Sequence, residues 1–231
     1  MYVPVWRAVR IFSIMTATSR GRSIYVLYTD DSILAGPDEA ELKQILEDMK
    51  ASGLQLTIEG DISNLLGVKV KRQPDGMIHM TQPQLMDSIL KDLSLHGPNV
   101  QTKNTPAKIG VTLTRHHESQ PYDGRFDYQS GIGKTNYLEK STSPEIAYAV
   151  HQFARFSADP KVKHGEAIKW LGRYLRGTRD KGLIFKPTDQ WFDCWVNADR
   201  AGNWDPTDSN HPDTARSRTG YVIRYAGCPI T

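Results

Sequence analysis

Cysteine is scarce in this 231-residue chain, which holds only Cys194 and Cys228. The two stand far apart and neither belongs to a C-x-x-C pair, so the sequence offers neither a disulfide framework nor the spacing of a zinc site. Free thiols of this kind are typical of a reducing compartment. We therefore expect an intracellular protein, cytoplasmic or nuclear.

Long apolar runs are also missing. No stretch approaches the ~18–20 apolar residues of a membrane span, so we expect no membrane association. Residues 1–22 hold four arginines and no acidic residue, and this segment stays unassigned. It is either a transit peptide or the chance start of a piece of a longer ancestral chain, and the lack of a long apolar region and of a small-residue cleavage site favours the second.

A strong charge of either sign is absent as well. Lys and Arg total 29 against 26 Asp and Glu, a net charge of +3, which excludes a histone-like protein. The charges are nevertheless separated along the chain. Residues 30–61 contain nine acids and two lysines (local charge −7), and residues 161–186 contain eight basic residues and two acids (local charge +6). A charged partner is therefore expected to bind one of these two regions and not the chain as a whole.

The first half of the chain is predicted to alternate between strands and helices. Residues 23–35 form a hairpin, and residues 38–51 form a helix because their apolar residues recur at i, i+3, i+4 and i+7. Residues 54–58 are predicted as a short strand. A second hairpin, residues 66–71 and 77–80, turns at Pro74-Asp75-Gly76, and an amphipathic helix follows over residues 82–95.

The second half is predicted to begin with a linker at residues 98–125, which are rich in Pro, Gly, Asn and Thr and show little periodicity. Helices are expected at residues 128–140, 143–156 and 160–175, and strands at 182–186, 191–196 and 220–225. The fold class is therefore α+β. In the third helix Lys169, Arg173 and Arg176 lie opposite the apolar stripe, and Arg179 extends them. This basic ridge suits a phosphate-binding surface or an ordinary solvated helix face.

The first hairpin carries the adjacent carboxylates Asp30 and Asp31 near its tip. Like charges this close repel unless a cation neutralises them, and Mg²⁺ prefers carboxylate oxygens. Asp is also a favoured turn residue, so the pair alone is more simply explained as a turn. His116-His117 also suggests a metal site, but no third ligand stands at a suitable spacing, which favours two loop residues.

Several segments together make the chain resemble the reverse transcriptase of copia-type LTR retrotransposon polyproteins. The resemblance begins with Tyr28-Thr29-Asp30-Asp31, which is similar to the Tyr-x-Asp-Asp box. It continues, in the order and spacing of the family, through residues 65–68, 104–107, 132–138, 142–150 and 164–178. It extends from about Ser23 to the C-terminus, and the long helical block makes it specific.

This resemblance implies a domain organisation and a set of site residues. Residues 23–97 would be part of the polymerase palm and thumb, residues 126–180 a helical connection, and residues 181–231 the start of a ribonuclease H-like domain. Asp30 and Asp31 would be catalytic carboxylates that bind Mg²⁺ or Mn²⁺ for nucleotide addition. Tyr28 would border the site and Gly67 would lie in the primer grip. The implied partners are an RNA or DNA template–primer duplex and dNTP, and the oligomeric state is left open.

Two departures from the family pattern bear on activity. The family's other palm carboxylate lies upstream of the box, and residues 1–22 contain no acid. The ribonuclease H pattern Asp-Ala-Asp stands here as Asn197-Ala198-Asp199, so a neutral amide replaces the first metal ligand and Asp199 is either a remaining ligand or a simple loop carboxylate. We expect the chain alone to be inactive. The alternatives are a non-catalytic nucleic-acid-binding module and a domesticated interaction scaffold.

Overall fold

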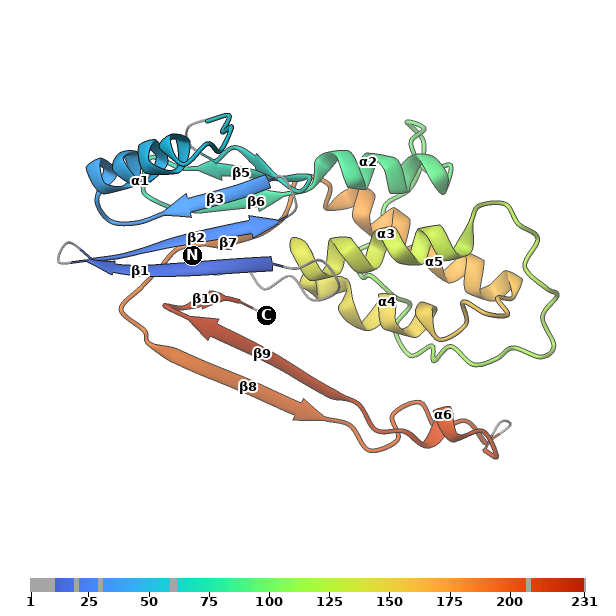
Figure 1. The fold of residues 1–231 in the computed structure, drawn as a ribbon. Helices are drawn as coiled ribbons and strands as arrows, with labels where there is room; N and C mark the ends of the chain where they lie inside the picture. Colours follow the sequence, from blue (N-terminus) through green and yellow to red (C-terminus); the bar gives the residue numbers. More distant parts are fainter. Residues whose placement is uncertain (1–10, 19–20, 29–30, 59–61, 207–208, 231) are drawn as a thin grey trace. The chain divides into compact units, whose positions relative to one another are not determined.

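The computed structural model describes residues 11–18, 21–28, 31–58, 62–206 and 209–230, with the backbone alone described for residues 11–18, 21–22 and 212–213. The chain forms two compact units, Met1–Leu66 and Gly67–Thr231. Its described part is a mixture of helices and three small antiparallel sheets (Figure 1). This mixture of helices and antiparallel sheets confirms the predicted α+β fold class.

The first unit contains a three-stranded antiparallel sheet in the order β1-β2-β3, with β1 at Ile11–Thr18, β2 at Gly21–Tyr28 and β3 at Asp31–Ala35. The predicted hairpin is the β2–β3 pair, in which Tyr28 lies opposite Asp31. β1 falls within the segment that the sequence left unassigned, and it pairs with β2 along its whole length, from Ile11 opposite Tyr28 to Thr18 opposite Gly21.

Helix α1, Glu39–Ala51, follows the sheet as predicted. The Asp38 side chain caps it by accepting a 3.0 Å hydrogen bond from the Glu41 amide. The chain leaves the helix through Gly53, whose φ of 92° is a conformation that glycine adopts without strain.

The strand predicted at residues 54–58 is wrong, because these residues have no regular structure. Leu54 and Ile58 are each 52% exposed, so the short apolar run is not buried in a sheet. A strand needs a partner for its backbone groups, and the apolar pattern of five residues could not show that one was missing. The first unit ends with β4, Asn64–Leu65.

The second unit is built on a helical core that confirms the predicted helices. Its elements are α2 (Pro83–Asp92), α3 (Tyr128–Ser141), the 3₁₀ helix η1 (Pro144–Ile146), α4 (Ala147–Ala154) and α5 (Val162–Gly177). The apolar stripe of α5 contributes Ile168, Leu171 and Leu175 to a core shared with Leu138 of α3 and Phe153 of α4. These side chains are almost fully buried.

Two antiparallel sheets complete this unit. In the first, β5 (Val68–Arg72), β6 (Ile78–Thr81) and β7 (Leu183–Phe185) lie side by side in that order. In the second, β9 (Thr219–Tyr225) lies between β10 (Cys228–Pro229) and β8 (Phe192–Ala198). The short helix α6, Pro212–Ala215, lies in the loop between β8 and β9. The second hairpin and the three late strands were predicted, whereas β10 was not.

The segment 98–125 contains no helix or extended strand, but it lies against the helical core. Leu113 is buried in that core. The Trp170 indole nitrogen of α5 donates a 2.9 Å hydrogen bond to the Thr105 carbonyl, and the Lys103 amide donates to the Arg173 carbonyl at 3.3 Å. The segment is therefore fixed along α5 at several points.

Candidate nucleic-acid interface and carboxylate hairpin

The β2–β3 hairpin positions the first group of predicted site residues. β2 ends at Tyr28 and β3 begins at Asp31, so the chain reverses between two residues that lie opposite each other. Asp31 is exposed and Tyr28 is half-buried. Asp30, the second predicted carboxylate, lies outside the described residues. The hairpin thus presents the Asp31 carboxylate to solvent at the point where the chain reverses.

The donor chemistry of this hairpin fits a hard divalent cation. Carboxylate oxygens are the protein ligands that Mg²⁺ prefers, usually together with water and phosphate oxygens. Within the described ranges, no group of three or more His, Cys, Asp and Glu side chains is arranged to hold a metal. Any ion at this hairpin would therefore take its remaining ligands from water, from a bound phosphate or from residues outside those ranges.

Gly67, the predicted primer-grip residue, lies in a tight turn just before β5. Its φ is 75° and that of the preceding Leu66 is 51°. A Cβ at Gly67 would meet no atom within 4 Å, so the turn needs glycine for its backbone conformation and not for lack of space. Gly67 is exposed, so its surface is open to a partner.

The basic ridge of α5 is present, and its residues differ in how they are held. Lys169, Arg173 and Arg176 are all half-buried. Arg176 donates a 2.8 Å hydrogen bond from Nη1 to the Leu95 carbonyl, which fixes its guanidinium against the end of α2. That bond leaves other guanidinium nitrogens to serve an anion, because the group carries five N–H donors.

Two further lysines contact α5 through Trp170, and no sequence pattern indicates them. Lys103 Nζ lies 4.5 Å and Lys108 Nζ 5.5 Å from the centroid of the Trp170 ring, which is the distance of a cation–π contact. Both come from the segment 98–125, which shows no periodicity that could place them beside α5. Aromatic residues with cations nearby are typical of nucleic-acid-binding surfaces, although the same contacts also fix the segment to the helix.

Arg179 forms an ion pair that qualifies its predicted role. Its Nε donates to Asp87 Oδ1 at 2.6 Å and its Nη2 to Asp87 Oδ2 at 2.5 Å. The hydrogen-bonded carboxylate raises the pKa of Arg179, and the guanidinium lowers the pKa of Asp87. Part of the Arg179 charge is therefore neutralised within the chain, so a phosphate would have to compete with Asp87 for it.

An open groove of about 580 Å³ lies beside this ion pair, between α2 and the end of α5. Its lining residues are Asp87, Leu90, Lys91, His96, Arg176 and Arg179. Lys91 and Arg176 leave the groove with a net positive charge, because Asp87 and Arg179 balance each other. The structure therefore brings two of the predicted nucleic-acid-binding residues together in one basic depression.

Asp199 is held by the strand connection next to it. Its Oδ1 accepts a 2.6 Å hydrogen bond from the Arg218 amide, and its own amide donates to the Arg218 carbonyl at 3.0 Å. A Cβ at Gly202 would overlap the Asp199 carboxylate, so the loop folds closely over it. Through these contacts Asp199 stabilises the connection between β8 and β9. Asn197 is exposed and lies opposite Gly220.

His116 and His117 lie in the loop before α3. The His116 Nδ1 is 3.3 Å from both Thr114 Oγ1 and Glu118 Oε1. Neither histidine belongs to a group of three metal-binding side chains among the described residues. The same residues contain no helix with the length and apolar character needed to cross a membrane.

The described residues thus offer an exposed carboxylate at a strand reversal in the first unit and, within the second, a basic helix with a groove beside it. Homologues of the chain are retrovirus-related Pol polyproteins from copia-type transposons. It is 28% identical over 214 residues to the polyprotein from transposon TNT 1-94 of Nicotiana tabacum, and 30% identical over 216 residues to that from transposon RE2 of Arabidopsis thaliana. The predicted resemblance to these polyproteins is confirmed.

The aligned regions cover 90% and 92% of this chain but only 15% and 14% of the two polyproteins, so the chain spans about one seventh of their length. An uncharacterized mitochondrial protein of Arabidopsis thaliana is 25% identical over 206 residues, which make up 79% of that protein. No protein-family model matches the sequence, and no solved structure matches it.

Proposed function

We propose that this chain is a segment of a retrotransposon polyprotein that binds template–primer duplexes along α5. In this proposal residues 23–97 are part of a reverse transcriptase palm and thumb, residues 126–180 the helical connection, and residues 181–231 the start of a ribonuclease H-like domain. The observation that carries the proposal is the homology to Pol polyproteins over about 90% of the chain.

The metal-binding part of the proposal rests on the hairpin. Asp30 and Asp31 would hold Mg²⁺ or Mn²⁺ through carboxylate oxygens. When bound, such an ion neutralises the charge that develops on the oxygens of a transferring phosphoryl group. The contribution of the chain itself is to place the Asp31 carboxylate at a fixed point, because the Tyr28–Asp31 pairing sets where the backbone reverses.

The duplex-binding part rests on the placement of positive charge. Lys169, Arg173 and Arg176 stand at i, i+4 and i+7 of one helix, so they occupy the same face. Arg176 is fixed by its bond to the Leu95 carbonyl, and a fixed guanidinium loses less conformational entropy when it contacts a phosphate. The groove between α2 and α5 widens this contact surface.

We further propose that these 231 residues, taken alone, do not catalyse nucleotide addition. Phosphoryl transfer depends mainly on positioning and charge neutralisation, and residues 1–22 add no carboxylate to Asp30 and Asp31. A non-catalytic nucleic-acid-binding module is the second candidate function. It is favoured by one observation: α5 and its groove lie within the second compact unit, whereas the carboxylate hairpin belongs to the first.

Duplex binding can be tested by fluorescence anisotropy with a labelled RNA–DNA duplex. The Lys169→Ala/Arg173→Ala double variant should bind the duplex at least about tenfold more weakly than the wild type, because each phosphate contact that is lost weakens binding. The matched control is Lys43→Ala/Lys50→Ala, which removes the same charge from exposed positions of α1. Equal losses in both variants would show that only net charge matters and would reject the α5 interface.

A further inference from the structure

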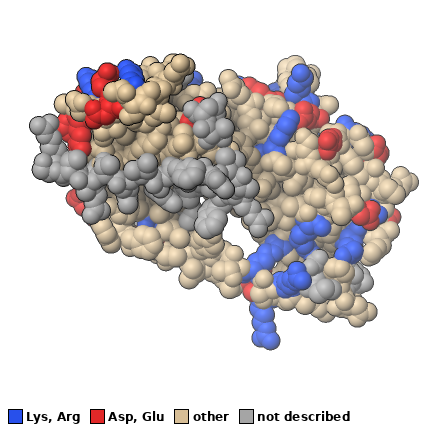
Figure 2. Space-filling view, viewed as in Figure 1, with Lys and Arg blue, Asp and Glu red and all other residues tan. Residues whose placement is uncertain are grey.

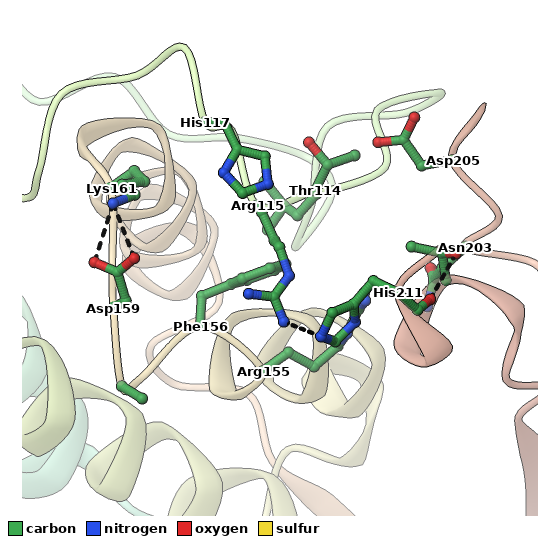
Figure 3. A pocket seen from close by; sticks show the side chains of 13 residues that line it. Thr114, Arg115, His117, Arg155, Phe156, Asp159, Lys161, Asn203, Asp205 and His211 are labelled. Carbon is green, nitrogen blue, oxygen red and sulfur yellow. Dashed lines mark hydrogen bonds and ion pairs between the residues drawn. The ribbon is translucent and has the colours of Figure 1, made fainter. Parts of the chain in front are cut away.

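Basic side chains gather on the face where α4 and the α6 loop lie, as Figure 2 shows. A cavity of about 140 Å³ opens there, next to the start of α5. Within it Lys161 pairs with Asp159, with Nζ 2.9 Å from Oδ2. Arg115 contacts His211 in the same cavity, as Figure 3 shows. A gathering of basic residues therefore does not by itself leave positive charge for an anion from outside the chain.

The groove between α2 and the end of α5 differs because two of its cations have no carboxylate partner among the described residues. Lys91 is exposed, and Arg176 donates its 2.8 Å hydrogen bond to a backbone carbonyl. The lining holds three basic side chains, Lys91, Arg176 and Arg179, and one acid, Asp87, so its formal charge is +2 with its histidine neutral. The groove thus retains positive charge that an external anion can neutralise.

The Asp87 carboxylate holds the Arg179 guanidinium in the way that a phosphate would. Asp87 Oδ1 accepts a hydrogen bond from Nε at 2.6 Å, and Oδ2 accepts one from Nη2 at 2.5 Å. Arginine binds carboxylate and phosphate groups alike through two parallel hydrogen bonds of this kind. In the free chain the guanidinium therefore already has the orientation that a phosphate in the groove requires, and an internal carboxylate occupies the place of the ligand.

This ion pair is weak enough to be exchanged. The side chains of Arg179 and Asp87 are 39% and 53% exposed, and water screens exposed pairs so that they contribute little free energy. Asp180 accepts a third bond, from Nη1 at 2.8 Å, and its side chain is 84% exposed. A phosphate that enters the groove also meets the positive charges of Lys91 and Arg176. These charges favour the phosphate over the carboxylate.

We propose that Asp87 occupies, in the free chain, the place that a phosphate of the nucleic-acid backbone takes on Arg179 when a duplex binds, and that Asp87 thereby limits the affinity of the groove. This inference rests on the proposed duplex binding along α5 and adds one contact to it. The two hydrogen bonds of the guanidinium pass from the Asp87 oxygens to two phosphate oxygens, and the released carboxylate is hydrated. Removal of the carboxylate should therefore tighten duplex binding.

The affinity of Asp87→Asn for a labelled RNA–DNA duplex, measured by fluorescence anisotropy with the full chain, tests this inference. The matched control is Asp92→Asn, which removes the same charge from the same helix and also breaks an ion pair, with Lys134 Nζ at 2.5 Å. Asp87→Asn should bind the duplex about two- to fivefold more tightly than Asp92→Asn, because only in Asp87→Asn is no ion pair left for the phosphate to displace. Equal affinities of the two variants would overturn the inference.

A double-mutant cycle separates the release of Arg179 from the general effect of charge. In the Arg179→Gln background, Asp87→Asn should change the affinity only as much as Asp92→Asn does, because no guanidinium remains to be released. A gain as large as that seen in the wild-type background would show that Asp87 acts through its charge alone and would overturn the inference. Urea unfolding of each variant without duplex checks that it is folded.

Nuclear magnetic resonance of the Arg179 Nε–H group provides a measurement that needs no duplex. Inorganic phosphate is the probe, at constant ionic strength, and the absence of the signal from Arg179→Gln identifies it. The signal should shift saturably in the wild type, and at about two- to fivefold lower phosphate concentration in Asp87→Asn. The wild-type titration keeps the inference testable if Asp87→Asn fails to fold, and absence of any shift would overturn it.

The two measurements together distinguish a failure of this inference from a failure of the proposed function. Duplex binding that is weakened by Lys169→Ala/Arg173→Ala but is equal in Asp87→Asn and Asp92→Asn would reject this inference alone. A saturable shift of the Arg179 signal without duplex binding by any variant would reject the proposed function, and it would identify free phosphate, in place of a nucleic-acid backbone, as the anion that displaces Asp87.

Discussion

Arg179 and Asp87 join the end of α5 to α2 through two parallel hydrogen bonds, from Nε to Oδ1 at 2.6 Å and from Nη2 to Oδ2 at 2.5 Å. Arg179 also donates from Nη1 to Asp180 Oδ1 at 2.8 Å. The guanidinium therefore contacts one carboxylate across the helix pair and a second beside it. A residue expected to contact nucleic acid also ties together the two helices that border the groove.

Asp87→Asn should lower the free energy of unfolding by about 0.5–1 kcal/mol at neutral pH. The value is small because the two side chains are 39% and 53% exposed, which screens the pair. The folded-state pKa of Asp87 is lowered, so its contribution is present above the unfolded pKa of about 3.9 and is lost as pH falls through the lower folded value. Urea unfolding of both proteins at pH 7 and at pH 3 measures this, and an equal difference at the two pH values would contradict it.

His164 should make stability depend on pH in the range where imidazole titrates. The side chain is fully buried and stacks on Phe156, with ring centroids 4.1 Å apart. Its Nδ1 accepts a 2.9 Å hydrogen bond from the Lys161 amide, so the proton of the neutral ring sits on Nε2, which lies 2.8 Å from the Thr114 carbonyl. Burial lowers the pKa of this ring, mainly by desolvation.

Because the folded pKa of His164 is lowered, its contribution to stability is complete above the unfolded pKa of about 6.5 and decreases as pH falls toward the folded value. His164→Gln should lower the free energy of unfolding by roughly 2–3 kcal/mol at pH 7.5, because hydrogen bonds and stacking are lost. This gap between the wild type and the variant should be smaller at pH 5.5. Denaturant unfolding across this range measures the gap. The exposed His96→Gln serves as control, and a gap that stays constant would reject the assignment.

Replacing two glycines with alanine, one at a time, should change the stability of the protein in opposite directions. Gly133 is exposed within α3, and a Cβ there meets no atom within 4 Å, so Gly133→Ala should stabilise the protein by about 0.5–1 kcal/mol through helix propensity. A Cβ at Gly182 would overlap the Met80 carbonyl oxygen, so Gly182→Ala should destabilise it by roughly 2–4 kcal/mol. Thermal unfolding gives both signs, and a stabilising Gly182→Ala would show that the chain entering β7 does not approach β6 as closely as described.

A primer-extension assay tests the proposed lack of polymerase activity in these 231 residues. With Mg²⁺ or Mn²⁺, a primed template and dNTP, we expect no extension above background, because the chain supplies too few carboxylates to position the reacting groups. Clear extension that disappears in Asp30→Asn would contradict this expectation and would instead establish the hairpin as a complete catalytic site.

Local signals in the sequence are enough to predict most elements of the fold. Pro74-Asp75-Gly76 marks the turn between β5 and β6, and Gly76 has the positive φ of 83° that such a turn requires. β1 was not predicted, because what defines it as a strand is its pairing with β2. The dipeptide Ser19-Arg20 between the two strands is not one that typically marks a hairpin turn. The prediction for residues 54–58 shows the opposite error: their apolar pattern suggested a strand, and the structure has none there.

The candidate sites are predictable to the extent that they are local in sequence. The i, i+4, i+7 spacing alone is enough to place Lys169, Arg173 and Arg176 on one face of α5. The Arg179–Asp87 pair, for example, joins residues 92 positions apart in the sequence. Only the tertiary packing creates such combinations, so no periodicity or motif could have indicated them.

The salt dependence of duplex binding tests the central claim most directly. Neutralising phosphates releases counterions, so the affinity of the wild type should fall steeply and linearly on a plot of log affinity against log salt. Lys169→Ala/Arg173→Ala should reduce the slope by about two, one for each phosphate contact removed, and Lys43→Ala/Lys50→Ala should leave it unchanged. Absence of measurable duplex binding at low salt, or an unchanged slope in the α5 variant, would contradict the account.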